Sequence, residues 1–193
     1  MKLITFEGLP GSNKTAVIDQ VAVKLQREGY SVGTWKEPRF KRNHPDDSIL
    51  ETLSYLTARR QHVLDMLQNY REGEIVLWNR FIDSTMAIQG YGDGVDIELI
   101  NQLNQLATAE LEIARTIWLS LPASKALENL TDRTGETPSL ARLQRIELGY
   151  QVLWMNDSPW HEGTATRRIY QVDLTQDPQT VLDQTLNLIR EVI

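Results

Sequence analysis

Hydrophobic and polar positions divide the chain into short apolar runs and longer amphipathic stretches. Five runs have the length and residue types of buried strands, in which several consecutive positions are apolar. They are Leu3–Phe6, Ser31–Trp35, Ile75–Trp78, Thr116–Leu119 and Arg168–Val172. Between these runs, apolar residues recur at intervals of three and four, which predicts helices. The expected helices are Thr15–Glu28, Ile49–Asn69, Ile97–Ala114, Ser124–Leu130, Leu140–Trp154 and Pro178–Ile193.

The alternation of strands and helices predicts an α/β fold. Short, continuously apolar strands separated by helices are typical of a parallel sheet that is covered on both faces. We therefore expect a three-layer sandwich with a five-stranded parallel sheet, built as a single domain over residues 1–193. Ligands of such sheets bind beyond the carboxyl ends of the strands. Functional residues are therefore expected directly after each strand.

A glycine-rich loop follows the first expected strand. Its sequence, Gly-Leu-Pro-Gly-Ser-Asn-Lys-Thr from Gly8 to Thr15, matches the P-loop pattern G-x-x-x-x-G-K-[ST] at Gly8, Lys14 and Thr15. Asn13 stands where the pattern has glycine, but asparagine tolerates positive φ better than most residues, so the loop is expected to keep its shape. Backbone N–H groups of such a loop and the following helix N-terminus cradle phosphates. An ordinary glycine-rich turn is the alternative reading.

The P-loop reading implies a P-loop NTPase-type sandwich and roles for six residues. Lys14 would add a point charge at the β- and γ-phosphates of ATP, and Thr15 would offer its hydroxyl to Mg²⁺. The residues expected to bind the ATP phosphates are Gly8, Gly11, Ser12, Asn13, Lys14 and Thr15.

Several further segments carry motifs in a fixed order along the chain. They are Phe6-Glu7-Gly8, Lys36-Glu37-Pro38, the helical stretch Leu53–His62, and Asn79–Gly92 with the sequence N-R-F-I-D-S-T-M-A-I-Q-G-Y-G. These segments resemble F-E-G, R-E-P, L-L-F-A-A-D-R-A-Q-H and D-R-Y-I-D-S-S-L-A-Y-Q-G-Y-G of the thymidylate kinase family of nucleoside monophosphate kinases. The resemblance covers most of the chain and continues to Gly149-Tyr150.

The resemblance implies transfer of the γ-phosphoryl group of ATP to dTMP or a related pyrimidine deoxynucleotide, with Mg²⁺ as cofactor. Catalysis of this kind consists mostly of positioning and charge neutralisation. The resemblance implies Lys14, Arg80 and Arg133 as the catalytic residues. The planar guanidinium of Arg80 suits a bridge between the donor and acceptor phosphates. A lid is expected over about residues 132–143, with Arg142 and Arg145 beside Arg133. A solvated helix face is the alternative reading for these lid arginines.

The resemblance also places residues at the acceptor. Tyr55 would stack on the base, and Arg59, one helical turn later, would hydrogen-bond to it. Thr85 and Gln89 would reach the base or sugar, and Arg39 would meet the acceptor phosphate. Glu37 is a candidate carboxylate for substrate and Mg²⁺, and Asp83 is a second such carboxylate. Core packing for Tyr55 and structural ion pairs or caps for the charged residues are the alternatives.

The chain departs from the family pattern at residues that bear on chemistry. Asn79 and Ser120 replace acids, Pro10 replaces the acid of the loop, and Ile88 replaces a tyrosine that bears on the sugar. Two alternatives to an active dTMP kinase therefore stay open. One is a nucleotide-binding protein with impaired catalysis, and the other is a kinase for a modified nucleotide or a nucleoside.

The amino-acid composition limits the classes of molecule that are expected to bind this protein. The 193 residues carry 20 Lys and Arg against 26 Asp and Glu, a formal charge of −6, so no nucleic-acid polymer is expected as a partner. The chain contains no cysteine, which excludes thiolate chemistry and cysteine-based metal sites. No apolar run approaches the length of a membrane span, and the start of the chain lacks a signal-peptide pattern, so the cytoplasm is the expected compartment. The long helices permit a homodimer.

Overall fold

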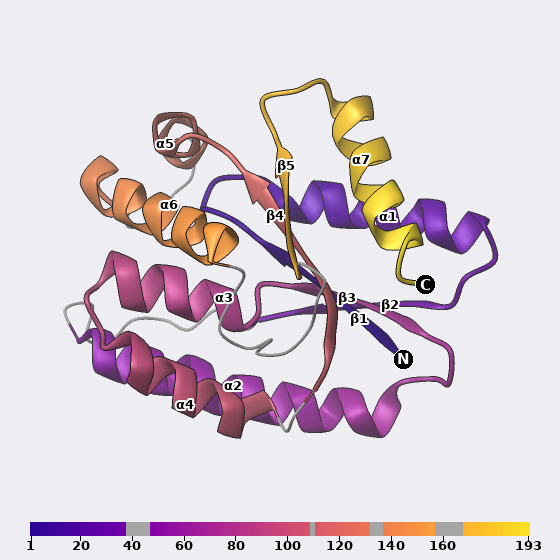
Figure 1. The fold of residues 1–193 in the computed structure, drawn as a ribbon, viewed down its shortest axis with the longest axis horizontal. Coiled ribbons are helices and arrows are strands. Elements are labelled where there is room, and N and C mark those ends of the chain that lie inside the picture. The colour runs from indigo at the N-terminus through magenta and orange to yellow at the C-terminus, as the bar shows by residue number, and fades with distance from the viewer. Residues whose placement is uncertain (38–46, 109–110, 132–136, 157–167) are drawn as a thin grey trace.

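Five parallel strands form one sheet in the order β2-β3-β1-β4-β5 (Figure 1). The computed structural model describes residues 1–37, 47–108, 111–131, 137–156 and 168–193. The strands are β1 (Lys2–Glu7), β2 (Val32–Lys36), β3 (Ile75–Asn79), β4 (Ile113–Ser120) and β5 (Ile169–Asp173). The helices are α1 (Lys14–Arg27), α2 (Ser48–Asn69), α3 (Ile82–Thr85), the π-helix η1 (Met86–Gly92), α4 (Ile97–Thr108), α5 (Ala123–Thr131), α6 (Leu140–Met155) and α7 (Pro178–Arg190).

Helices cover both faces of the sheet, as Figure 1 shows with α1 and α7 on one side and α2 and α4 on the other. Apolar residues of α1 and α7 pack with Ile4 and Phe6 of β1 in one buried cluster. Leu3 of the same strand belongs to a different cluster, with Val63 and Met66 of α2. Because side chains alternate across a strand, β1 buries apolar groups on both sides. The predicted α/β sandwich with a five-stranded parallel sheet is confirmed.

The order of the strands places the site. From β1 the chain runs to β2 and β3 on one side of β1, and it then crosses to β4 on the other side. The carboxyl ends of β1, β3 and β4 therefore surround the point where the winding direction changes. Ligands of open parallel sheets bind at such a point.

One predicted helix boundary is wrong. The helix expected over Ile97–Ala114 ends at Thr108, and Ile113 already pairs with Leu3 as the first residue of β4. Apolar spacing continues across the connection, so periodicity alone does not mark the change from helix to strand. The other predicted strands and helices agree with the structure within a few residues at each end. Of the expected lid segment, Leu140–Leu143 forms the first turn of α6, and residues 132–136 lie outside the described residues.

The pattern of apolar positions did not predict α3 and η1, although they carry the most specific motif of the chain. Five of the seven residues of η1 are buried, and π-helical turns are frequent at functional sites. Among the described residues, no helix combines the length and the apolar character that a membrane span requires.

A buried ion pair joins α3 to the start of β5. Asp83 accepts hydrogen bonds from Nη1 and Nη2 of Arg168, each at 2.8 Å, and both side chains are almost fully buried. The hydroxyl of Thr116 on β4 also binds Asp83, at 3.4 Å, and lies 2.7 Å from the hydroxyl of Thr5 on β1. Asp83 is therefore a structural residue rather than a carboxylate available to a metal ion.

Removing the charge of Asp83 is expected to destabilise the protein strongly. Asp83→Asn leaves the buried Arg168 guanidinium without its counter-charge, and the loss of one partner of a buried ion pair typically costs about 3 kcal/mol or more. Urea unfolding should show this decrease in the free energy of unfolding. Asp183→Asn is the matched control, because Asp183 is exposed on α7, and it should change stability by less than about 0.5 kcal/mol. Equal small effects of both changes would contradict a structural role for Asp83.

Candidate active site

The glycine-rich loop between β1 and α1 has the backbone of an anion-binding loop. Gly8 and Gly11 have φ values of 145° and 85°, and a Cβ on them would lie 2.4 Å from the carbonyl oxygen of Leu119 and 2.3 Å from that of Ala126. Asn13 adopts the left-handed conformation, with φ 54° and ψ 28°, directly before the first turn of α1. The predicted tolerance of Asn13 for positive φ is confirmed. The loop therefore keeps its curvature without the usual third glycine.

Lys14 is folded back into this loop. Its Nζ donates to the carbonyl oxygens of Gly8 at 3.0 Å and Leu9 at 2.8 Å, and to Oγ of Ser12 at 3.0 Å. Ser12 in turn donates to the carbonyl of Leu9 at 2.9 Å. The ammonium group is therefore held inside the loop that the sequence assigns to phosphates.

The end of β3 meets the start of α1 through two polar side chains. Nδ2 of Asn79 donates to Oγ1 of Thr15 at 3.0 Å. Asn79 is largely buried, and Thr15 is exposed at the mouth of the loop. The replacement of an acid by Asn79 therefore leaves an amide in contact with the hydroxyl that the P-loop pattern assigns to Mg²⁺.

Arg80, the next residue, has a strained backbone and a half-buried side chain. Its φ is 68°, in the left-handed region that residues other than glycine rarely adopt. Its backbone N–H donates to the carbonyl of Phe6 on β1 at 3.0 Å, which fixes the turn. Nη1 donates to Oγ of Ser84 at 3.1 Å and to the hydroxyl of Tyr150 at 3.4 Å. Strain of this kind is typical of functional positions.

Glu7 is a fully buried carboxylate at the end of β1. Its Oε1 accepts from the backbone N–H of Phe81 at 2.8 Å, and its Oε2 accepts from the hydroxyls of Ser84 and Tyr150. Burial, followed by the nearby negative charge of Asp83, raises the pKa of Glu7 above its ordinary value, although the hydrogen bond from Ser84 acts in the opposite direction. Glu7 and Arg80 thus share the same two hydroxyl groups.

Arg59 is enclosed beside this region. Its Nε donates to Glu37 at 2.9 Å, Nη1 donates to Oδ1 of Asn104, and Nη2 donates to the carbonyl of Phe81 at 3.0 Å and to Oγ1 of Thr85 at 2.8 Å. Its exposed fraction is 1%, so the guanidinium is held rigidly. Oε2 of Glu37 is buried and has no hydrogen-bond partner among the residues that the structure describes.

The structure thus brings three predicted acceptor-site residues, Glu37, Arg59 and Thr85, into one cluster. The backbone links this cluster to the loop, because Glu37 N–H donates to the carbonyl of Asn79 at 3.2 Å. Tyr55 is half-buried on α2, one turn before Arg59. Gln89 is buried on η1. Arg39 and Arg133 lie outside the described residues.

Arg142 and Arg145 fasten α6 to the end of η1. Arg142 forms a two-pronged ion pair with Asp93, at 2.5 and 2.7 Å, and this hydrogen-bonded partner raises the pKa of the guanidinium. Arg145 donates twice to the carbonyl oxygen of Gly92, at 3.0 and 2.8 Å. Arg142 is half-buried, and Arg145 is exposed although its guanidinium binds Gly92. The role of both arginines at the phosphates stays a prediction.

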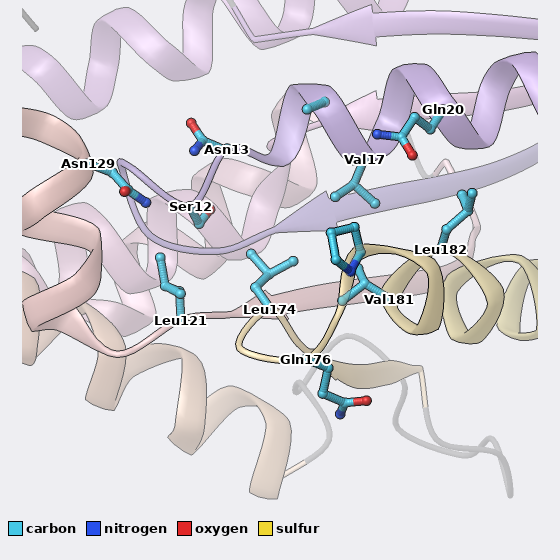
Figure 2. A pocket seen from close by; sticks show the side chains of 12 residues that line it. Ser12, Asn13, Val17, Gln20, Leu121, Asn129, Leu174, Gln176, Val181 and Leu182 are labelled. Carbon is cyan, nitrogen blue, oxygen red and sulfur yellow. The ribbon is translucent and has the colours of Figure 1, made fainter. Parts of the chain in front are cut away.

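A pocket of about 300 Å³ opens beside the P-loop. Figure 2 shows that side chains of the loop, α1, the β4–α5 connection and the start of α7 surround it. Its apolar walls include Val17, Leu121, Leu174 and Pro178, and carboxamides of Asn13, Gln20, Asn129 and Gln176 lie around it. Apolar walls with a few hydrogen-bonding groups are typical of small-molecule sites.

Comparison with known proteins decides the family. The family model for thymidylate kinase matches residues 6–173. The chain belongs to the thymidylate kinase family. It is 30% identical to a thymidylate kinase from Bacillus pumilus over 98% of this chain and 95% of that protein. It is 35% identical to one from Nostoc punctiforme over 79% of this chain and 82% of that protein.

A solved structure agrees with this membership. The crystal structure of thymidylate kinase from Ehrlichia chaffeensis superposes with a TM-score of 0.74 at 25% sequence identity, over 97% of this chain and 98% of that chain. The resemblance that the sequence predicts is therefore confirmed, and with it the expected class of enzyme, an ATP-dependent nucleoside monophosphate kinase.

Sequence reasoning missed three residues of this thymidylate kinase-family site. The sequence offers Glu7 only as part of the Phe-Glu-Gly motif and Tyr150 only as one of a residue pair, and no motif contains Asn104. A carboxylate at the end of a buried strand was the available signal for Glu7, because a charge there needs partners. Asn104 occupies a buried position between Ile100 and Ala107 on α4, and a buried carboxamide there needs partners.

The raised pKa of Glu7 predicts a pH dependence of stability. Because the folded pKa lies above the unfolded one, the unfolded state ionises first as pH rises above about 4.3. We compare the free energy of unfolding of the wild type with that of Glu7→Gln at each pH. As pH rises from about 4.3, the difference, wild type minus variant, should fall until the pKa of Glu7 in the folded protein is passed. Denaturant unfolding at a series of pH values tests this. Glu98→Gln, an exposed position on α4, should give a flat difference, and a rise with pH for Glu7 would contradict the assignment.

Proposed function

We propose that this chain catalyses the transfer of the γ-phosphoryl group of ATP to dTMP. An oxygen of the dTMP phosphate attacks the γ-phosphorus, and the bond to the β-phosphate oxygen breaks, giving dTDP and ADP. The observation that carries the proposal is the placement of Lys14, Thr15 and Arg80 around one strand end in a member of the thymidylate kinase family. Catalysis would rest on positioning and charge neutralisation.

The loop would bind the phosphates of ATP. Gly8, Gly11, Ser12 and Asn13 belong to the turn that precedes α1, Lys14 and Thr15 are the first residues of α1, and the amino end of this helix favours negative charge. Lys14 would exchange its contacts with loop carbonyls for contacts with the β- and γ-phosphates. Arg80 would bridge the donor and acceptor phosphates, for which its half-buried guanidinium has room to present donors.

The pocket beside the loop would hold the base of ATP. It is continuous with Ser12 and Asn13, so a nucleotide with its phosphates in the loop would extend toward it. Val17 and Leu174 offer apolar surface to the faces of a purine ring. The carboxamides of Gln20, Asn129 and Gln176 can both donate and accept, as the ring edge of adenine requires.

The residues near the loop fit a Mg²⁺ ion. No group of three or more His, Asp or Glu side chains arranged for a metal occurs in the described parts of the chain. Mg²⁺ bound with a nucleotide needs only one or two protein ligands in addition to phosphates and water. Thr15 would hold the ion, with Asn79 orienting the Thr15 hydroxyl and Glu37 as the nearby carboxylate. The ion would neutralise charge on the β- and γ-phosphates.

The cluster around Arg59 would bind the acceptor. Arg59 is fixed by four hydrogen bonds, so a remaining Nη1 donor would meet a carbonyl of the base with little loss of entropy. Thr85, Glu37 and Gln89 lie on the elements around it, and Tyr55 would stack on the base. Arg39 would meet the acceptor phosphate, and Arg133 in the lid would contribute charge at the reaction centre.

We also propose that the chain forms a homodimer through α2 and α4. Ile49, Leu53, Leu64 and Leu67 are exposed and lie along one side of α2 by helical spacing. Leu106, on the neighbouring α4, is 74% exposed. Exposed apolar side chains gathered on neighbouring helices, here with the exposed Arg60 among them, are typical of a protein–protein contact. The compartment, expected from the sequence to be the cytoplasm, stays a prediction.

The first test is formation of nucleoside diphosphate from Mg·ATP and a panel of ribo- and deoxynucleoside monophosphates. We expect dTMP to give the highest kcat/KM. Lys14→Ala should lower kcat/KM for dTMP by about 100-fold or more, because a charge directed at the transferring phosphates is lost. Lys24→Ala, an exposed lysine in the last turn of α1, is the matched control and should leave the rate unchanged.

Two results of this panel would revise the proposal. A higher kcat/KM for another acceptor would keep the kinase and replace dTMP as its substrate. Binding of ATP and dTMP without turnover of any acceptor would indicate a nucleotide-binding protein with impaired catalysis.

Restoring the acid at Asn79 should strengthen the metal site. Asn79→Asp places a carboxylate beside Thr15, and such groups around a metal change affinity by about tenfold. We expect the Mg²⁺ concentration for half-maximal rate to fall by about that factor. Asn69→Asp, at the exposed end of α2, should leave it unchanged. An unchanged or higher Mg²⁺ requirement in Asn79→Asp would mean that the site is built around the neutral amide.

A further inference from the structure

Two hydroxyl groups from different helices accept hydrogen bonds from the guanidinium group of Arg80. Ser84 belongs to α3, and Tyr150 belongs to α6, which follows the expected lid in the chain. Nη1 of Arg80 donates to the Ser84 oxygen at 3.1 Å and to the Tyr150 oxygen at 3.4 Å. These two oxygens lie 3.1 Å apart and so act on the guanidinium together.

The same two hydroxyls donate to a single carboxylate oxygen. Ser84 and Tyr150 both bind Oε2 of Glu7, Tyr150 at 3.2 Å. The other oxygen of Glu7 is bound by the backbone of Phe81, so the carboxylate cannot turn away. Glu7, Ser84 and Tyr150 have exposed fractions of 0, 5 and 2%, and water therefore does not compete for these groups.

The direction of these hydrogen bonds matters for Arg80. A guanidinium has only donors, and a hydroxyl has one hydrogen and two lone pairs. A hydroxyl can serve Arg80 only if its hydrogen points elsewhere. The carboxylate of Glu7 accepts both hydrogens, which leaves lone pairs of both oxygens facing Arg80. Glu7 therefore determines that both hydroxyls act as acceptors toward Arg80, although it forms no direct hydrogen bond with the arginine.

We propose that Glu7, Ser84 and Tyr150 are positioning residues that aim the Arg80 guanidinium at the transferring phosphoryl group. This inference rests on the proposed function, because it assumes that Arg80 acts on phosphates. Because Tyr150 belongs to α6, the orientation of the Arg80 guanidinium depends on how α6 packs against the rest of the protein.

Contacts other than these hydroxyl groups also hold α6 in its position. Gly149 packs so closely on Tyr91 that a Cβ would lie 2.8 Å from the Tyr91 Cβ. Arg142 and Arg145 bind Asp93 and the carbonyl of Gly92. The ring of Tyr150 stacks on Trp118, with centroids 6.2 Å apart. Burial raises the pKa of Tyr150 above its ordinary value, which keeps its hydroxyl protonated and able to donate to Glu7.

Tyr150→Phe is the central test, because it removes one oxygen and keeps the ring on Trp118. The full chain is assayed with Mg·ATP and dTMP, and the rate of phosphoryl transfer is measured in single turnovers, well below the unfolding temperature. We expect a rate about tenfold lower, with KM for both substrates within about twofold of wild type. Tyr170→Phe, on β5 with its ring against Arg115, is the matched control and should not change the rate.

A double-mutant cycle with Arg80→Lys separates positioning from general stabilisation. Lysine lacks the guanidinium donor that spans both hydroxyls, so Tyr150→Phe should lower the Arg80→Lys rate by less than about twofold. Glu7→Gln is the second variant, since its amide can donate and thereby turn the hydroxyl hydrogens toward Arg80. It should lower the wild-type rate at least as much as Tyr150→Phe, with little further loss when both are combined.

The outcomes distinguish this inference from the proposed function. If the wild type turns over dTMP but Tyr150→Phe slows the wild type and Arg80→Lys by the same factor, the positioning role is wrong and the reaction stands. An unchanged rate in Tyr150→Phe would also overturn the role. If the wild type transfers no phosphoryl group to any acceptor, the proposed function itself fails.

Discussion

The carboxylate of Glu7 is fully enclosed at the carboxyl end of the central strand, and the geometry of the site depends on how its charge is accommodated. A buried charge is tolerated only when it is fully hydrogen-bonded. Glu7 obtains its donors from Phe81, Ser84 and Tyr150, which belong to the start of α3, to α3 itself and to α6. Two segments that are distant from β1 and from each other in sequence, residues 81–84 and α6, therefore converge on the end of β1. The glycine loop begins at the next residue, so its origin is fixed by the same group.

Arg59 provides the corresponding constraint on the other side of the site. Its guanidinium is buried against Glu37, Asn104 and Thr85, whereas the guanidinium of Arg80 is only half-buried. The two arginines consequently have different characters. Arg59 is held rigidly by its partners, which suits the role in acceptor binding that is proposed for it. Arg80 sits on a strained backbone with fewer contacts, which suits a group that interacts with charge as it moves.

The fold and the loop followed from the sequence because both are local patterns. Runs such as Ile75–Trp78 and the glycine spacing of residues 8–15 report structure over a few residues, and the structure reproduces them. The contacts of buried polar groups are long-range and leave no such pattern. Asn104 lies 45 residues from Arg59, and Tyr150 lies 143 residues from Glu7. The partners of Arg142 and Arg145, which are Asp93 and the carbonyl of Gly92, are likewise distant from them in sequence. The end of α4 was missed because apolar spacing does not change where the helix stops.

The position of Lys14 has a consequence for the energetics of nucleotide binding. Its ammonium already satisfies two loop carbonyls and the hydroxyl of Ser12. In the proposed reaction the lysine would turn to a phosphate, and these buried acceptors would lose a charged donor where an unsatisfied group is costly. Binding would then be an exchange of partners rather than a simple gain of contacts. The affinity for ATP would then reflect the difference in free energy between the loop bonded to Lys14 and the loop bonded to phosphates. Many contacts in the complex are therefore compatible with moderate affinity and with ready release of ADP.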